Sequence, residues 1–264
     1  MKRTIYILLL LLCLPLLATA QEEPTQEIVT ERTATKNAGD EAYSQERYQE
    51  AIEIYQEVLE KEGETLELHY NLGNAYFRNN MIGEAILNYE RALKIDPTDD
   101  ATKFNLDFAY GRIKDETPQA DKIFFIEWGR AFVNMFSIDT WAVIAVVTFI
   151  LLLASVLLII FGKNTAMRRS SIIVAILSFV ITLSANISAY NIYTVMTDDS
   201  NAIVMKEEVN VKSSPDNSGT ILIKIHEGRK VRVLDDTIKD WVEIEVDNGK
   251  LIVGWVPAHT IERV

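Results

Sequence analysis

The hydrophobic residues of the chain are concentrated in three runs, which divide it into modules of different kinds. These runs cover residues 5–17, 141–161 and 171–193. The segment between the first two runs contains an internal repeat of helical character, and the last 65 or so residues alternate between apolar and polar positions as short strands do. The pattern predicts a multi-domain membrane protein with an α-helical solenoid, a two-helix transmembrane hairpin and a small all-β barrel.

The first apolar run has the features of an export signal. Lys2 and Arg3 precede it, and Ala18-Thr19-Ala20 follow it with the small residues that a signal peptidase requires. We therefore predict a signal peptide at residues 1–20, followed by a polar tether at 21–35. Two alternatives are a lipoprotein signal that uses Cys13, which has Leu12 where a small residue is expected, and an uncleaved anchor that would form a third span.

An internal repeat with a period of 34 residues follows the tether. Glu50-Ala51-Ile52 and Tyr55 reappear as Glu84-Ala85-Ile86 and Tyr89, and Gly39 reappears as Gly73. A fixed period of this length indicates stacked pairs of helices. Asp96-Pro97 ends the second copy, because proline cannot continue a helix.

A third copy begins at Asn105-Leu106, which repeats Asn71-Leu72, but it stops before Pro118. We interpret it as a capping helix, because an open hydrophobic face at the end of a repeat array is costly in water. The predicted module covers residues 36–116. Two repeats and a cap make a short array, so we expect it to depend on neighbouring segments for stability.

The repeat resembles the tetratricopeptide repeat, although Ala42 and Gly63 depart from the family pattern in the first copy. The resemblance implies a concave groove, lined by the first helix of each unit, that binds a peptide or a partner helix. Carried over position by position, its lining is Lys36, Asp40, Tyr43, Tyr70, Asn74, Phe77, Arg78, Phe104 and Phe108. The alternative is that several of these aromatic side chains only pack against the adjacent helix.

The membrane part begins with residues 117–140, where aromatic and charged residues alternate. This pattern is typical of a helix at a membrane interface, and the alternative is a soluble linker helix packed on the repeats. The uncharged segments 141–161 and 171–193 are each long enough to cross a hydrocarbon core of roughly 30 Å. In the second segment Ser178, Thr182 and Asn186 share one helical face, which we interpret as a packing surface rather than an ion path, because neither span has an ionisable residue.

The connecting loop, residues 162–170, fixes the expected topology. It contains Lys163, Arg168 and Arg169 and no acidic residue, and short basic loops remain in the cytoplasm. The export signal and this loop together predict a multi-pass protein of the bacterial inner membrane, with the repeats and the C-terminal module both facing the periplasm.

Residues 200–264 have several short strands with turn residues between them, including the hairpin signal Asp247-Asn248-Gly249. The segment resembles the bacterial SH3-like domain, through Val209-Asn210-Val211, Trp241 and Gly254-Trp255-Val256 among others. The resemblance implies binding of cell-wall peptides or protein partners, with Asn210, Trp241 and Trp255 as candidate contacts. The alternative is that both tryptophans fill the core of the barrel.

Charge and composition narrow the functional classes. The formal net charge is -12, so nucleic acid is an unsuitable partner. Cys13 is the only cysteine, and the three histidines lie in different modules, so we expect neither a metal site nor a cofactor. No phosphate-binding loop or hydrolase motif is present in the sequence. The chain is therefore predicted not to be an enzyme.

The order of the modules is similar to that of the BatE family of the Bacteroides aerotolerance operon. This resemblance implies a scaffold beside membrane proteins with von Willebrand A domains and a MoxR-type ATPase, in an envelope complex linked to stress or oxygen tolerance. A second hypothesis is a cell-wall sensor whose SH3-like domain binds peptidoglycan peptides. A third, a cell-wall hydrolase, lacks a catalytic constellation in the sequence.

Overall fold

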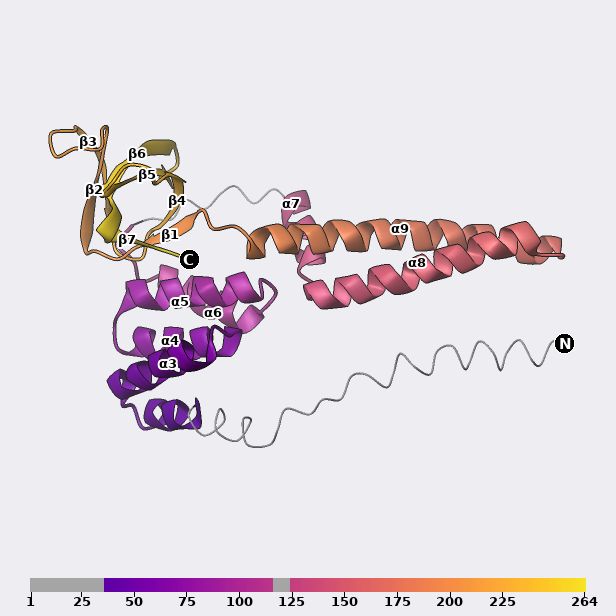
Figure 1. The fold of residues 1–264 in the computed structure, drawn as a ribbon, viewed down its shortest axis with the longest axis horizontal. Helices are drawn as coiled ribbons and strands as arrows, with labels where there is room; N and C mark the ends of the chain where they lie inside the picture. The colour runs from indigo at the N-terminus through magenta and orange to yellow at the C-terminus, as the bar shows by residue number, and fades with distance from the viewer. Residues whose placement is uncertain (1–35, 116–123) are drawn as a thin grey trace.

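The computed structural model describes residues 36–115 and 124–264. The predicted signal peptide at 1–20 and tether at 21–35 lie outside the described residues. Within the described part, helical repeats, a long helical hairpin and an antiparallel sheet follow one another along the chain, as expected from the sequence. Figure 1 shows the repeats and the sheet together at one end of the molecule, with the hairpin extending away from them.

The repeat region consists of a helical segment at residues 36–44 and four further helices. These are α3 (Tyr48–Glu62), α4 (Leu66–Arg78), α5 (Ile82–Ile95) and α6 (Asp100–Tyr110). The turn inside each repeat has the same geometry, because Glu46 and Asn80, which are 34 positions apart, both have a φ of 61°. Thr65 and Asp99 begin α4 and α6 by accepting hydrogen bonds from backbone N–H groups of the first turn, which satisfies donors that have no partner inside the helix.

The membrane hairpin begins with the short helix α7 (Phe124–Val133) and continues as α8 (Ile138–Phe161) and α9 (Thr165–Met196). Both long helices have the length and composition of membrane spans, and only 6% and 17% of their most apolar windows are buried, so they are not core helices of a soluble domain. The predicted loop at 162–170 is shorter in the structure. Asn164 caps α9 through its side chain, so Arg168 and Arg169 lie in the first turns of that helix.

The C-terminal module is an antiparallel sheet with the strand order β3-β2-β6-β5-β4-β1-β7. Its strands are β1 (Asn201–Val204), β2 (Glu208–Lys212), β3 (Ile221–His226), β4 (Lys230–Asp235), β5 (Trp241–Asp247), β6 (Leu251–Pro257) and β7 (Ile261–Arg263). Alternate residues point inward, so that Val242, Ile244 and Val246 of β5 are buried in the core of the sheet. The fold is therefore the small all-β barrel that the sequence predicts.

The sheet packs directly on the second repeat, which the sequence did not predict. Ile203 of β1 is fully buried and belongs to the same hydrophobic cluster as the repeat helices, and Met205 and Val264 pack against that cluster. At the turn before β4, a Cβ on Gly228 would lie 2.6 Å from Ile113, which shows how closely the two surfaces approach. The short repeat array thus has the sheet as its neighbour.

Candidate binding surfaces

The residues predicted for the groove lie on the first helix of each unit. Lys36, Asp40 and Tyr43 are on the helical segment 36–44; Tyr70, Asn74, Phe77 and Arg78 are on α4; and Phe104 and Phe108 are on α6. Their role in binding a partner stays a prediction. The contacts of their side chains, however, separate those that hold the repeats together from those that are presented to solvent.

Asp40 and Asn74 occupy equivalent positions in the two repeats, and their side chains hold the repeats together. The Tyr55 hydroxyl donates to Asp40 Oδ1 at 2.6 Å, and the Tyr89 hydroxyl donates to Asn74 Oδ1 at 2.7 Å. The side-chain amide of Asn105, from the next unit, also donates to Asn74 Oδ1 at 2.8 Å. Burial raises the pKa of both tyrosines, so their hydroxyls remain protonated donors. These two polar residues therefore connect helices within the repeat region.

Exposed Phe104 and Phe108 of α6 and half-buried Phe77 of α4 form an aromatic surface. The exposed fractions of Phe104 and Phe108 are 72% and 58%, which is unusual for phenylalanine. The rings of Phe77 and Phe108 are 5.5 Å apart, and the Arg112 guanidinium lies 5.8 Å from the Phe77 ring centre. Arg112 was missed at the sequence level, although it lies four positions after Phe108.

A second aromatic cluster lies at the other end of the groove. The rings of Tyr43 and Tyr48 are 5.4 Å apart, and the Arg78 guanidinium lies 4.9 Å from the Tyr48 ring centre. Burial raises the pKa of Tyr43, and the positive charge of Arg78 opposes this shift. Lys36, by contrast, forms 2.8 Å ion pairs with Asp40 and with Glu67, so its charge is largely neutralised within the groove.

The three residues predicted for the SH3-like domain lie on one outer face of its sheet. Lys212 of β2 pairs with Trp255 of β6, and Trp255 pairs with Glu243 of β5. Asn210 is two positions before Lys212 in β2, and Trp241 is two positions before Glu243 in β5. Because side chains alternate between the two faces of a strand, Asn210 and Trp241 point to the same face as these paired residues. The Lys212 ammonium group lies 5.4 Å from the Trp241 ring centre.

Both tryptophans are half-buried and neither belongs to the buried core, which consists of aliphatic residues. The alternative that they fill the barrel is therefore wrong, because Val, Ile and Ala side chains already occupy that space. Asn210 adds a polar group: its Oδ1 is buried and has no hydrogen-bond partner among the described residues.

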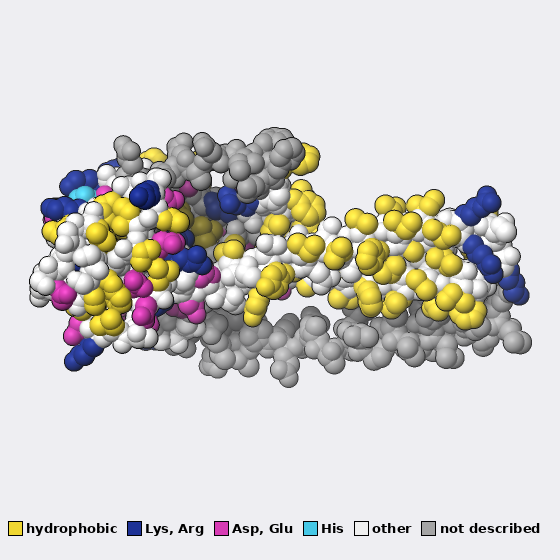
Figure 2. Space-filling model, turned by 90° about the horizontal axis from the view of Figure 1, so that it is seen from above, with side chains coloured by type: hydrophobic (Ala, Val, Ile, Leu, Met, Phe, Trp, Pro, Cys, Tyr) yellow, Lys and Arg dark blue, Asp and Glu magenta, His cyan; other side chains and the backbone are white. Residues whose placement is uncertain are grey.

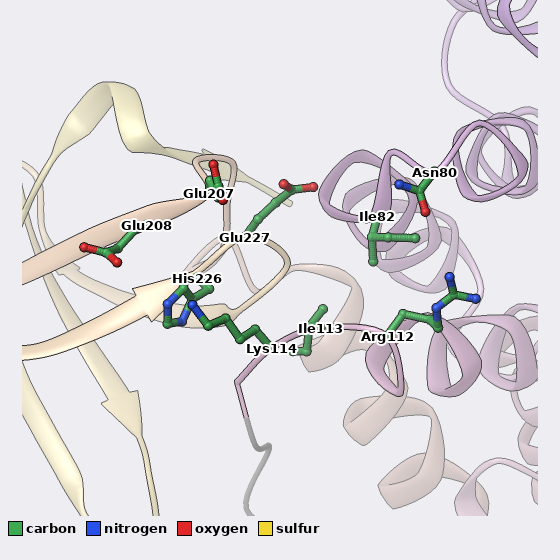
Figure 3. Close-up of a pocket in the computed structure, with 9 residues that line it drawn as sticks. All are labelled: Asn80, Ile82, Arg112, Ile113, Lys114, Glu207, Glu208, His226 and Glu227. Carbon is green, nitrogen blue, oxygen red and sulfur yellow. The ribbon is translucent and has the colours of Figure 1, made fainter.

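A cleft of about 310 Å³ separates the repeats from the sheet (Figure 3). The backbone N–H of His226, one of its lining residues, donates to Asp115 Oδ2 at 2.8 Å, and His226 Nδ1 lies 2.5 Å from Asp115 Oδ1. Glu227 accepts a 2.8 Å hydrogen bond from the backbone N–H of Gly83 at the start of α5. His226, the last residue of β3, therefore connects the two modules.

Further ion pairs join the modules away from this cleft. Glu90 of α5 accepts a hydrogen bond from the Tyr110 hydroxyl at 2.7 Å and forms a 2.7 Å ion pair with Lys230 of β4. In the first repeat Gln56 takes the place of Glu90 and donates to the Tyr76 hydroxyl at 2.8 Å. Glu90 thus keeps the hydrogen bond to the tyrosine of the next helix that Gln56 also makes, and it adds an ion pair with the sheet.

The membrane hairpin is held together by small and hydroxyl residues. Ser178 and Ala185 are buried against α8, and the hydroxyls of Thr182 and Thr148 are 2.7 Å apart. Asn186, predicted on the same face, is exposed, and its amide donates to the Thr182 carbonyl within α9. Figure 2 shows apolar side chains along the rest of the hairpin and basic ones at its far tip. An exposed apolar surface of this length is typical of helices that associate with a membrane.

Comparison with known families identifies the two soluble modules. The tetratricopeptide repeat family matches residues 36–100, and the bacterial SH3 domain family matches residues 207–262. No curated protein matches the chain. The chain is thus a combination of two domain types that serve in binding, joined by two helices whose exposed apolar surface indicates association with a membrane.

Proposed function

We propose that the protein is a non-enzymatic adaptor of the bacterial inner membrane that brings protein partners together in the periplasm. One observation carries this proposal: two binding modules are packed against each other at the same end of an apolar hairpin (Figure 1). A partner held by the groove and a ligand held by the SH3-like face would then be at a fixed relative position. The many contacts between the modules support a rigid unit rather than two domains on a flexible linker.

The orientation follows from two features of the sequence. The signal at residues 1–20 directs the repeats out of the cytoplasm, and the basic residues at the tip of the hairpin remain inside. Lys163, Arg168 and Arg169 lie in the turn between α8 and α9 and in the first turns of α9, at the end of the hairpin opposite to the modules, as this orientation requires.

The order of the modules, similar to that of the BatE family, suggests the partners. We expect membrane proteins with von Willebrand A domains, and an associated MoxR-type ATPase system, in a complex that serves aerotolerance or the stress response. The aromatic surface of Phe77, Phe104 and Phe108 supports a protein partner, because aromatic residues beside arginine are enriched where proteins bind one another.

Crosslinking in native membranes, followed by identification of the attached proteins, tests this function. Phe104→Ala/Phe108→Ala should reduce recovery of the membrane partners at least about tenfold, because two interface aromatics contribute on that order. Leu251→Ala, which truncates an exposed apolar side chain of β6 outside both predicted surfaces, is the control for a general loss of fold. Undiminished recovery with the folded double variant would contradict the groove assignment.

The alternative function, sensing of the cell wall, is supported by the outer face of the sheet. Trp241 and Trp255 present half-buried ring surfaces on the outer face of the sheet, with the Lys212 ammonium group over Trp241, which suits a peptide that packs on aromatic rings. Peptidoglycan sedimentation with the full chain in detergent separates the two functions. Firm retention that Trp255→Ala removes and Phe104→Ala/Phe108→Ala does not would favour the sensor.

A further inference from the structure

A second pocket, of about 500 Å³, lies where the repeats meet the membrane hairpin. Its walls come from three elements: α5 of the second repeat, the short helix α7, and the last turns of α9. Leu93, Val133 and Val195 provide apolar surface, Arg130 and Asn134 provide a cation and an amide, and Glu90 provides an acid that is paired with Lys230 of β4. The pocket is thus amphipathic and has the size of a small-molecule site.

Trp141 holds α7 against the start of α8. The Trp141 side chain is buried at the start of α8, and its indole N–H donates to the Val133 carbonyl at 2.9 Å. Phe132 and Phe136 pack on the same indole, with ring centres 5.3 and 5.2 Å away. These contacts hold α7 at the end of the span, which is the level of the lipid headgroups.

The exposed side chains of α7 are of the kinds found at the level of the lipid headgroups. Trp128 is 72% exposed and Met135 is 61% exposed, and Tyr190 on the neighbouring turn of α9 is 68% exposed. Tryptophan and tyrosine are enriched at the boundary between hydrocarbon and water, where the ring is in apolar surroundings and its polar atom is hydrated. The exposed side chains of α7 and of the end of α9 are thus of the kinds that a membrane interface accommodates.

We propose that this pocket binds the headgroup and upper acyl chain of one phospholipid, which connects the second repeat to the membrane surface. The phosphate would lie toward Arg130 and Asn134, and the chain would pack between Leu93 and Val195. The pocket is too small for a whole lipid, so the rest of the chains stay in the bilayer. This site rests on the membrane placement proposed above, and it does not depend on the protein partner.

Gly129 offers a sharp test, because it lines the pocket and a Cβ added there would meet no atom within 4 Å. Gly129→Phe should fill the pocket without straining α7, and Gly129→Ala is the control that adds helix propensity but little volume. The full chain is purified in detergent, stripped of lipid and titrated with phosphatidylglycerol, and bound lipid is counted by native mass spectrometry. Wild type and Gly129→Ala should retain one lipid, and Gly129→Phe should bind at least about tenfold more weakly, since excluding two methylene groups has that effect.

Two further experiments identify the ligand. Arg130→Gln should weaken the preference for phosphatidylglycerol over phosphatidylethanolamine, and millimolar inorganic phosphate should not displace the lipid. Equal retention by Gly129→Phe and wild type, or displacement by phosphate alone, would overturn the proposal. Carbonate extraction of membranes is done in parallel: a chain that is integral but binds no lipid refutes only this site, whereas a chain that is extracted refutes the membrane placement itself.

Discussion

The hydroxyl of Tyr89 donates a 2.7 Å hydrogen bond to Asn74 Oδ1, and this contact defines the internal geometry of the second repeat. The same contact exists 34 positions earlier between Tyr55 and Asp40. Gly73 makes room for it, because a Cβ there would lie 2.6 Å from the Tyr89 ring. A glycine, a polar acceptor and a tyrosine therefore act together in each repeat.

This relationship predicts that the two tyrosine hydroxyls contribute alike to stability. Tyr89→Phe and Tyr55→Phe should each lower the free energy of unfolding by about 1 kcal/mol, the net value of one hydrogen bond. Gly73→Ala should cost about 1–3 kcal/mol, because the ring has to move. Chemical denaturation of the full chain in detergent measures these effects, with Gly129→Ala as the glycine control. A Gly73→Ala variant as stable as wild type would contradict the packing described.

Docking of the sheet on the repeats predicts a difference between two glycines. Gly228 and Gly249 both have positive φ, 80° and 74°, but only at Gly228 would a Cβ also collide with Ile113 and Ile86. Gly249→Ala should cost about 1 kcal/mol from backbone strain alone. Gly228→Ala should cost about 1–3 kcal/mol more and should increase amide exchange in α5 and β1. Equal costs, with unchanged exchange, would mean that the modules are not docked in solution.

The buried His69 predicts an acid sensitivity of the repeats. Burial lowers the pKa of His69, and its Nε2 has no hydrogen-bond partner among the described residues, while Nδ1 lies 3.0 Å from Asn88 Oδ1. The unfolded chain therefore binds a proton at a pH where the folded chain does not, and stability falls as the pH drops below the unfolded value of 6.5.

The expected slope from this residue is at most about 1.4 kcal/mol per pH unit, and it ends at the lowered pKa of the folded state. His69→Gln keeps a donor for Asn88 and removes the titration. Denaturation at pH 7.5 and pH 5 should therefore show a smaller loss in the variant than in wild type. Identical losses in the two proteins would show that His69 is not the titrating group.

Much of this architecture could be predicted because it depends on local pattern. The recurrence of Gly39 as Gly73 and of Tyr55 as Tyr89 predicts paired helices, and the alternation in β5 predicts a strand with one buried face. The roles of Asp40 and Asn74 were harder to infer, because a groove position and a position that bonds to the neighbouring helix follow the same spacing. The sequence did contain one signal, since Asp40 and Asn74 each lie 15 positions before a repeated tyrosine, Tyr55 and Tyr89.

The docking of the modules was not predictable, because it depends on residue pairs far apart in the chain. Lys230 is 140 positions from Glu90, and no periodicity relates a sheet residue to a helix residue. The one local sign was the change from Gln56 in the first repeat to Glu90 in the second, at a buried position. An acid placed there requires a cation nearby, but the sequence does not specify which.

The central claim is that both modules lie on the periplasmic side of one membrane hairpin, and single cysteines test it most directly. In a Cys13→Ser background, Gln49→Cys on α3, Ser218→Cys on the β2–β3 loop and Asn164→Cys at the hairpin tip place an exposed thiol in each region. A membrane-impermeant maleimide added to intact spheroplasts should label the first two variants and spare the third until the membrane is permeabilised. Labelling of Asn164→Cys alone would place both modules in the cytoplasm and contradict the account.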